Sequence, residues 1–222
     1  MLSLERWIDP LTESNCYLLG ENGRAVVIDP NHPRGPLELL ERLGWETGGV
    51  PPPPRHPLRR APSGPRGGPR PRRWPGVPAA ATAVCSANLQ DKRLNMTQRM
   101  EVYLTFRGKP GVSYPPFVCA PAELPYERRW ETVWQGHRLQ CEALPGHTPG
   151  SAGIFLDGDT FFSGDYLIPG EKVILRLPGG SETDYRARTR PFLAQLPPGL
   201  RICPGHGAPY TLTGEEWSQD GL

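Results

Sequence analysis

Three residues whose side chains can bind a metal ion each follow a short apolar run and stand beside a glycine. His147 lies in the turn formed by residues 144–151, Asp165 follows residues 161–164, and His206 ends residues 200–206. Neutral imidazoles and carboxylates are ligands that zinc and similar divalent ions accept from proteins. Strand ends hold side chains in fixed positions, so this pattern predicts part of a metal site.

Taken singly, a His or an Asp beside a glycine is more simply explained as a turn residue or a surface group. The three together favour a shared site, because each follows the same arrangement of an apolar run and a glycine turn. A bound divalent ion lowers the pKa of water from about 16 to about 7, so that a hydroxide at neutral pH can attack a carbonyl carbon. The group therefore predicts hydrolytic chemistry.

Predicted strands position these residues. Residues 138–143 alternate polar and apolar side chains, which is the pattern of a strand, and they lead into the turn that carries His147. Near the N-terminus, residues 15–28 predict a hairpin whose turn contains Asn22 and Gly23.

The rest of the chain adds helices and further strands. Residues 36–43 carry leucines on one helical face and are followed by Gly44, which is typical of a helix end. Residues 185–196 predict a second helix with its cap at residues 183–184, and residues 101–106 predict a strand. Strands and helices alternate at both ends, which indicates an α/β fold.

The composition predicts one folded domain with an anomalous segment inside it. A chain of 222 residues can bury one sizeable core, so a single domain spanning residues 1–222 is the economical prediction. Five cysteines without CxxC spacing, and an N-terminus without the apolar core of a signal peptide, predict a reduced, cytoplasmic protein. No apolar run is long enough to cross a bilayer, so no membrane partner is expected.

The anomalous segment comprises residues 50–85. Between residues 50 and 78 there are eleven prolines and seven arginines, and no acidic residue occurs between Thr47 and Gln90. Such a segment cannot pack as a helix or strand, which predicts a disordered Pro/Arg-rich stretch carrying +7 in a chain of net charge +2. Only Trp74 interleaves with the arginines, so we do not expect nucleic-acid binding.

The N-terminal strand pair and the three turns resemble the metallo-β-lactamase-fold hydrolases, in particular the hydroxyacylglutathione hydrolase, or glyoxalase II-like, branch. The resemblance covers residues 11–45 and about residues 86–215, and the turn at residues 146–151 is its most specific part. It implies an αββα sandwich in which the Pro/Arg-rich segment replaces one strand and the metal-binding loop.

In that family the replaced strand ends in a His-x-His-x-Asp-His motif, which this sequence lacks. The resemblance implies two zinc ions, or iron or manganese ions, held by the motif together with the residues matching His147 and His206. It further implies that Asp165 bridges both ions as the catalytic carboxylate and that Asp29 supports the ligands from behind. Only the metal ligands His147, Asp165 and His206 remain, so reduced or absent occupancy is expected. His56 is no substitute, because the arginines beside it repel a dication.

An out-of-frame translation is a second interpretation of this segment, beside a genuine insert. If residues 51–54 are encoded by CCN codons and Arg55 by CGN, reading from the second base gives codons that can spell His-x-His-x-Asp. The next shifted codon cannot encode the final His, so one shift alone does not restore the whole motif. Both interpretations stay open.

The predicted function is metal-dependent hydrolysis of a small-molecule acyl thioester or ester by a metal-bound hydroxide, impaired here by the missing ligands. A lactone or a phosphodiester stays open as the substrate. The alternative is a non-catalytic binding protein that holds an anionic partner with its Arg-rich loop. The oligomeric state is not predicted.

Overall fold

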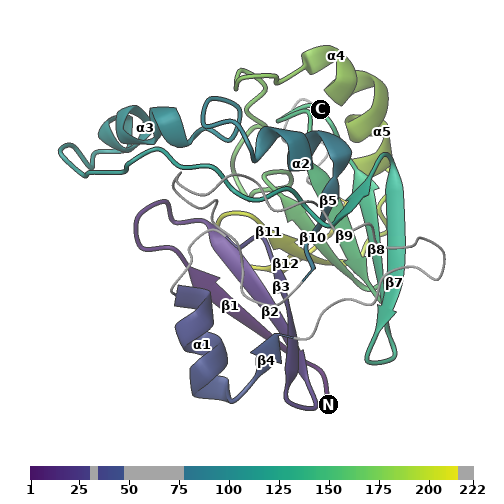
Figure 1. Cartoon of the computed structure of the whole chain (residues 1–222). Coiled ribbons are helices and arrows are strands. Elements are labelled where there is room, and N and C mark those ends of the chain that lie inside the picture. The colour runs from purple at the N-terminus through teal and green to yellow at the C-terminus, as the bar shows by residue number, and fades with distance from the viewer. Residues whose placement is uncertain (31–34, 48–77, 215–222) are drawn as a thin grey trace.

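The computed structural model describes residues 1–30, 35–47 and 78–214, so most of the Pro/Arg-rich segment lies outside the described residues. Within the described residues, two larger sheets dominate the fold (Figure 1). The smaller of these has the strand order β1 (Ser3–Ile8), β2 (Asn15–Glu21), β3 (Arg24–Ile28) and β4 (Glu46–Thr47). The larger has the order β12 (Tyr210–Thr211), β11 (Arg201–Pro204), β10 (Thr160–Gly164), β9 (Ala152–Leu156), β8 (His137–Ala143) and β7 (Arg129–Trp134).

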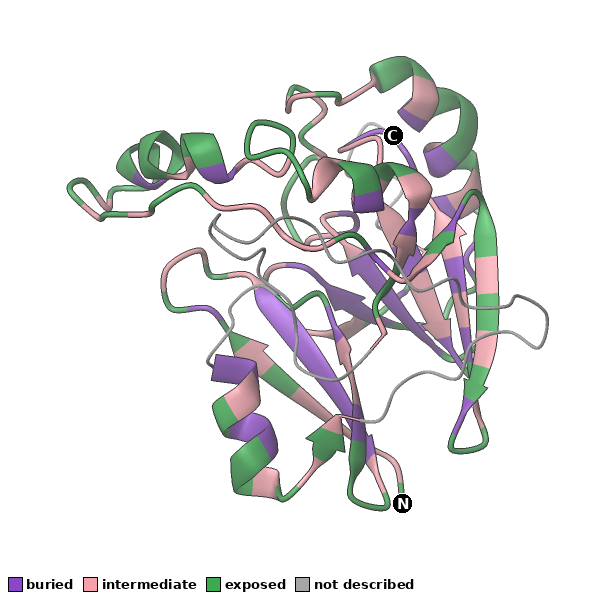
Figure 2. Ribbon diagram, in the orientation of Figure 1, coloured by how far each residue is buried: buried purple, intermediate pink, exposed green. Residues whose placement is uncertain are grey.

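The inner faces of the two sheets pack together and form one hydrophobic layer. Strand β2 is buried on both faces, so alternate side chains serve two layers. Tyr17 and Leu19 point into the layer between the sheets, where they meet Leu139 and Phe162 of the larger sheet. Figure 2 shows this arrangement, because buried residues are frequent along the strands of the two sheets that face each other.

Helices cover the outer faces. Helix α1 (Gly35–Leu43) packs Leu39 and Leu40 against the other side of β2, and Gly44 after it has a φ of 66°, so the predicted helix and its end are confirmed. The outer face of the larger sheet is covered by consecutive helical turns, namely α4 (Glu182–Asp184), η2 (Tyr185–Thr189) and α5 (Arg190–Leu193). The predicted αββα sandwich is therefore confirmed.

The cap of this second helical region differs from the prediction. Ser181, rather than residue 183 or 184, is the N-cap, because its side chain accepts a hydrogen bond from the backbone N–H of Asp184. The helical region thus begins one turn earlier, and its first residue follows the cap directly.

Strand direction decides where the loops of the larger sheet meet. Strands β10 and β11 are parallel, and β9 is antiparallel to both β8 and β10. Strands β8, β10 and β11 therefore run in the same direction. Their C-terminal ends lie along one edge of the sandwich, so the turns that follow them are neighbours.

Residues 78–126 form an arm beside this edge. Strand β5 (Ala80–Thr82) pairs with β6 (Leu124–Tyr126), and α2 (Ala83–Asn88) follows β5. The arm then continues through η1 (Thr97–Arg99) into α3 (Met100–Phe106), which projects from the body of the molecule in Figure 1.

The strand predicted at residues 101–106 is wrong, because these residues form helix α3. Their alternation matched a strand, but of the helix's seven residues only Leu104 is buried. The arm places no neighbouring strand beside them among the described residues, so the backbone satisfies its hydrogen bonds within a helix. None of the helices in the described part of the chain combines the length and apolar character needed to cross a membrane.

Candidate functional site

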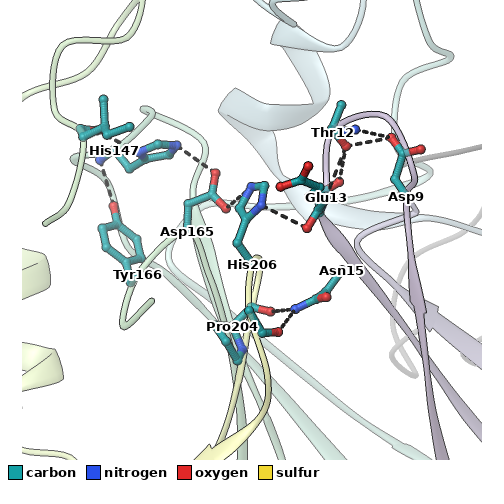
Figure 3. A network of polar contacts seen from close by, with 12 residues as sticks. Asp9, Thr12, Glu13, Asn15, His147, Asp165, Tyr166, Pro204 and His206 are labelled. Atoms are coloured by element: carbon teal, nitrogen blue, oxygen red, sulfur yellow. Dashed lines mark hydrogen bonds and ion pairs between the residues drawn. The ribbon is translucent and has the colours of Figure 1, made fainter. Parts of the chain in front are cut away.

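The three predicted metal ligands meet at the edge where β8, β10 and β11 end. His147 lies in the turn after β8, Asp165 directly follows β10, and His206 follows β11. The Nε2 atom of His147 is 3.0 Å from Oδ2 of Asp165, and the Nε2 atom of His206 is 3.7 Å from Oδ1 of the same carboxylate (Figure 3). Asp165 thus lies between the two imidazoles.

His147 is buried and held by hydrogen bonds on two sides. Its Nδ1 atom lies 2.7 Å from the carbonyl oxygen of Ile174, which can only accept, so Nδ1 carries the proton. Its backbone N–H donates to the hydroxyl of Tyr166 at 2.9 Å, and that hydroxyl donates to the carbonyl of Leu144 at 2.7 Å. The ring is therefore fixed with its Nε2 atom toward Asp165.

Two glycines allow the His147 turn to approach its neighbours. Gly146 has a φ of 146°, and a Cβ atom there would lie 2.7 Å from Cβ of Tyr185. A Cβ atom on Gly150 would lie 2.7 Å from Cα of Cys85 in α2. The turn is thus enclosed between η2 and α2, which explains why its sequence is rich in glycine.

His206 is held by the loop that precedes β2. Its Nδ1 atom donates to the carbonyl oxygen of Glu13 at 3.1 Å, and Ser14 forms a β-bridge with it. Asn15 fixes the same turn, because its side-chain amide donates to the carbonyl oxygens of Pro204 and Gly207, each at 2.8 Å. No sequence pattern indicated the roles of Glu13 and Asn15. The only signal was a polar Asn at the start of a buried strand.

The hydrogen bonds determine which ring nitrogens face the carboxylate. Both histidines donate from Nδ1 to a backbone carbonyl, so in their neutral forms both present a bare Nε2 atom. These two nitrogens and the carboxylate of Asp165 are all acceptors when the rings are neutral. Such a group is stable only with a proton or a cation among its members, and a cation among them is what the predicted metal chemistry requires.

The ionisation of His147 and Asp165 is coupled. Burial alone would lower the pKa of His147, but the hydrogen bond and the charge of Asp165 outweigh burial and raise it. Burial would raise the pKa of Asp165, but the hydrogen bond and charge of His147, together with the charge of His206, lower it. In the absence of a cation, the charged pair is therefore the favoured state.

Asp29, the predicted supporting residue, directly follows β3 at the same edge. Its φ is 52°, and the surrounding protein atoms together with the nearby carboxylate of Asp165 raise its pKa to about 6, although the residue is exposed to solvent. Two carboxylates that repel each other are stabilised by a positive charge nearby. The location is consistent with a supporting role, which stays a prediction.

The donor set has the right chemistry for a metal ion but too few members. His147 and His206 approach different oxygens of Asp165, so each ion site would have one imidazole nitrogen and one carboxylate oxygen. Catalytic zinc sites use three protein ligands. Among the described residues, no three His, Cys, Asp or Glu groups gather closely enough to hold an ion. These residues therefore do not close a metal centre.

Comparisons with known proteins agree with this architecture. No protein-family model and no curated protein matches the chain, whereas solved structures do. The B3 metallo-β-lactamase BLEG-1 matches with a TM-score of 0.71 and 18% identity over 98% of both chains. The metallo-β-lactamase family protein TTHA1429 from Thermus thermophilus matches with a TM-score of 0.61 and 19% identity, over 98% of this chain and 77% of its own. TTHA1623, in a di-iron-bound form, matches with a TM-score of 0.57 and 21% identity over 96% of each chain.

These similarities define the fold. The chain has the metallo-β-lactamase fold. Its candidate site lies where the three parallel strand ends of that fold meet.

Proposed function

We propose that this chain is a metal-dependent hydrolase of the metallo-β-lactamase superfamily whose activity on a thioester or ester is impaired by an incomplete metal centre. The observation that carries the proposal is the position of Asp165 between the Nε2 atoms of His147 and His206. The fold supports the hydrolase class, and the low number of ligands among the described residues supports the impairment.

The chain's own residues define what the site can still do. His147 and His206 keep fixed ring orientations, because backbone carbonyls accept from their Nδ1 atoms. Asp165 offers one oxygen to each ring and, together with the two imidazoles, would help to hold a metal ion. A bound zinc, iron or manganese ion would supply a hydroxide at neutral pH. The described residues do not complete its coordination, so we assign no reaction step to it.

The glyoxalase II-like branch and a small-molecule acyl thioester or ester substrate are parts of the same proposal. The turn at residues 146–151 supports the branch, since it is the most specific part of the resemblance. TTHA1623 binds two iron ions in its di-iron form, which supports iron as an alternative to zinc or manganese.

Hydrolysis assays test the proposal. The purified full chain would be supplied with zinc, iron(II) or manganese(II) and assayed with a short acyl thioester and an aryl acetate. We expect slow hydrolysis that Asp165→Asn abolishes and His137→Gln leaves unchanged, because His137 lies at the opposite end of β8 from the candidate site. Rapid, metal-dependent hydrolysis would contradict the impairment, and hydrolysis insensitive to Asp165→Asn would contradict the assigned site.

The alternative, an anion-binding protein, concerns arginines that lie outside the described residues. A nucleic-acid mobility-shift assay at several salt concentrations separates the two functions. Counterion release makes binding fall steeply with salt if the Arg-rich segment holds the partner. We expect no such binding, and a steep salt dependence would favour the alternative.

A further inference from the structure

A single lysine fastens the loop between β1 and β2 to the arm. Lys109 follows α3, and its Nζ atom lies 3.0 Å from Oε1 of Glu13. The same Nζ atom donates to the carbonyl oxygens of Leu11 at 2.8 Å and Pro10 at 3.4 Å. An ammonium group has three N–H donors. The loop therefore offers one acceptor for each donor of Lys109.

The same loop carries the acceptor for His206. The carbonyl oxygen of Glu13 accepts from Nδ1 of His206 at 3.1 Å, while the carboxylate of Glu13 contacts Lys109. Figure 3 shows Glu13 beside His206, with its carbonyl group directed to the imidazole. One residue thus joins the arm to the candidate site through two different groups.

The backbone of Glu13 is held in an unfavourable conformation. Its φ is 61°, in the left-handed region, where a residue with a Cβ atom is strained. Within the loop, the N–H of Glu13 donates to the carbonyl of Asp9 at 2.8 Å, and Thr12 Oγ1 donates to Oδ2 of Asp9 at 2.6 Å. Lys109 adds contacts that hold this loop from outside.

We propose that Lys109 is a positioning residue for His206. By holding the loop, Lys109 keeps the Glu13 carbonyl on Nδ1 of His206, so that the neutral ring carries its proton on Nδ1 and directs Nε2 toward Asp165. The catalytic meaning of this arrangement rests on the proposed function. The positioning itself requires neither a metal ion nor a substrate.

The geometry distinguishes Lys109 from an ordinary surface ion pair. An exposed ion pair contributes little, and the side chain of Glu13 is 57% exposed. Lys109 is more buried, at 29%, and contacts two backbone carbonyls in addition to the carboxylate. Arg107 also approaches the Glu13 carboxylate, at 3.5 Å, but it is 48% exposed and has no hydrogen bond to a loop carbonyl among the described residues. Arg107 is therefore the matched control for charge alone.

The test measures the tautomer of His206 in the metal-free full chain. Protein labelled with ¹⁵N-histidine would be studied by NMR at an alkaline pH, where imidazoles are neutral, and the His206 signals would be assigned with His206→Gln. We expect wild-type His206 to be protonated at Nδ1. In Lys109→Gln, we expect a roughly fivefold change in the tautomer ratio toward Nε2–H, as for the loss of one hydrogen bond. Arg107→Gln should leave the ratio unchanged. The signals of His147, whose Nδ1 partner is Ile174, should not change in either variant.

Two results would overturn the inference. One is an unchanged His206 tautomer in folded Lys109→Gln, and the other is an equal change in Arg107→Gln, which would show a general charge effect. If Lys109→Gln does not fold, Lys109→Arg is measured instead. A guanidinium presents its donors in a planar fork rather than around one nitrogen, so the three contacts should be weakened; a smaller change in the same direction is expected, and no change would contradict the inference. The tautomer is measured without a metal ion. A lack of hydrolytic activity would therefore contradict only the proposed function and not the positioning role of Lys109.

Discussion

The Nε2 atom of His147 lies 3.0 Å from Oδ2 of Asp165, although the two residues follow different strands. The contact exists because β8 and β10 run in the same direction and end at one edge of the larger sheet. Hydrogen bonds from the ring and backbone of His147 then fix its orientation.

Tyr166→Phe is predicted to destabilise the protein through the His147 turn. The Tyr166 hydroxyl is buried, accepts from the His147 N–H and donates to the Leu144 carbonyl, so its removal leaves two buried backbone groups unpaired. The free energy of unfolding should fall by about 1–3 kcal/mol in urea titrations. Tyr103→Phe is the control, because Tyr103 is exposed on α3 and should change stability by less than about 0.5 kcal/mol. Equal effects of the two substitutions would contradict the prediction.

His137 is predicted to make stability depend on pH. Its Nδ1 atom lies 2.5 Å from Asp157 Oδ2 and its Nε2 atom 3.2 Å from Glu21 Oε2, which joins the two sheets away from the candidate site. The hydrogen bond with Asp157 outweighs burial and, with the charges of both carboxylates, raises the pKa of His137. A raised pKa in the folded state means that the stabilisation is complete below the ordinary value of about 6.5. It is lost as the pH rises through the raised value.

The measurement compares unfolding free energies below and above this range. We expect the loss with rising pH to be about 0.5–1 kcal/mol larger in the wild type than in His137→Gln, because the raised pKa of His147 leaves a step of its own in both proteins. The Glu21 and Asp157 carboxylates, whose pKa values are lowered, and the Met1 amino group beside Glu21 are the other charged groups in this cluster. The two carboxylates lose their contribution at acidic pH, a separate window. An identical step in both proteins would assign it to another group.

The family resemblance was sufficient to predict the sandwich, and the strand-end pattern was sufficient to predict the meeting of His147, Asp165 and His206. Each follows a strand with a clear apolar pattern, and strand ends of the same direction share an edge. The hairpin turn at Asn22 and Gly23 was equally predictable, because the Asn-Gly dipeptide favours positive φ angles. The structure has φ angles of 50° and 73° there.

The arm could not be predicted in the same way. Residues 101–106 alternate like a strand, but they have no sheet to join among the described residues and form α3 instead. The contact between Lys109 and Glu13 joins residues far apart in the sequence, and neither belongs to a local pattern. Such contacts depend on the tertiary path of the chain rather than on periodicity.

The coding DNA tests the origin of the segment at residues 50–78, which lies almost entirely outside the described residues. Under the out-of-frame hypothesis, we expect the codons for residues 51–55, read from their second base, to spell His-x-His-x-Asp. Because one shift does not supply the final His, a second change of frame is expected between codons 46 and 88. A clean open frame in which no base offset recovers the motif would establish a genuine insert.

Metal analysis of the purified full chain tests the incomplete centre most directly. After dialysis against metal-free buffer, zinc, iron and manganese would be counted by inductively coupled plasma mass spectrometry, with Asp165→Asn as the reference. A site with only His147, Asp165 and His206 as ligands should retain at most one weakly held ion, which Asp165→Asn loses. Two tightly held metal ions per chain would contradict the incomplete metal centre.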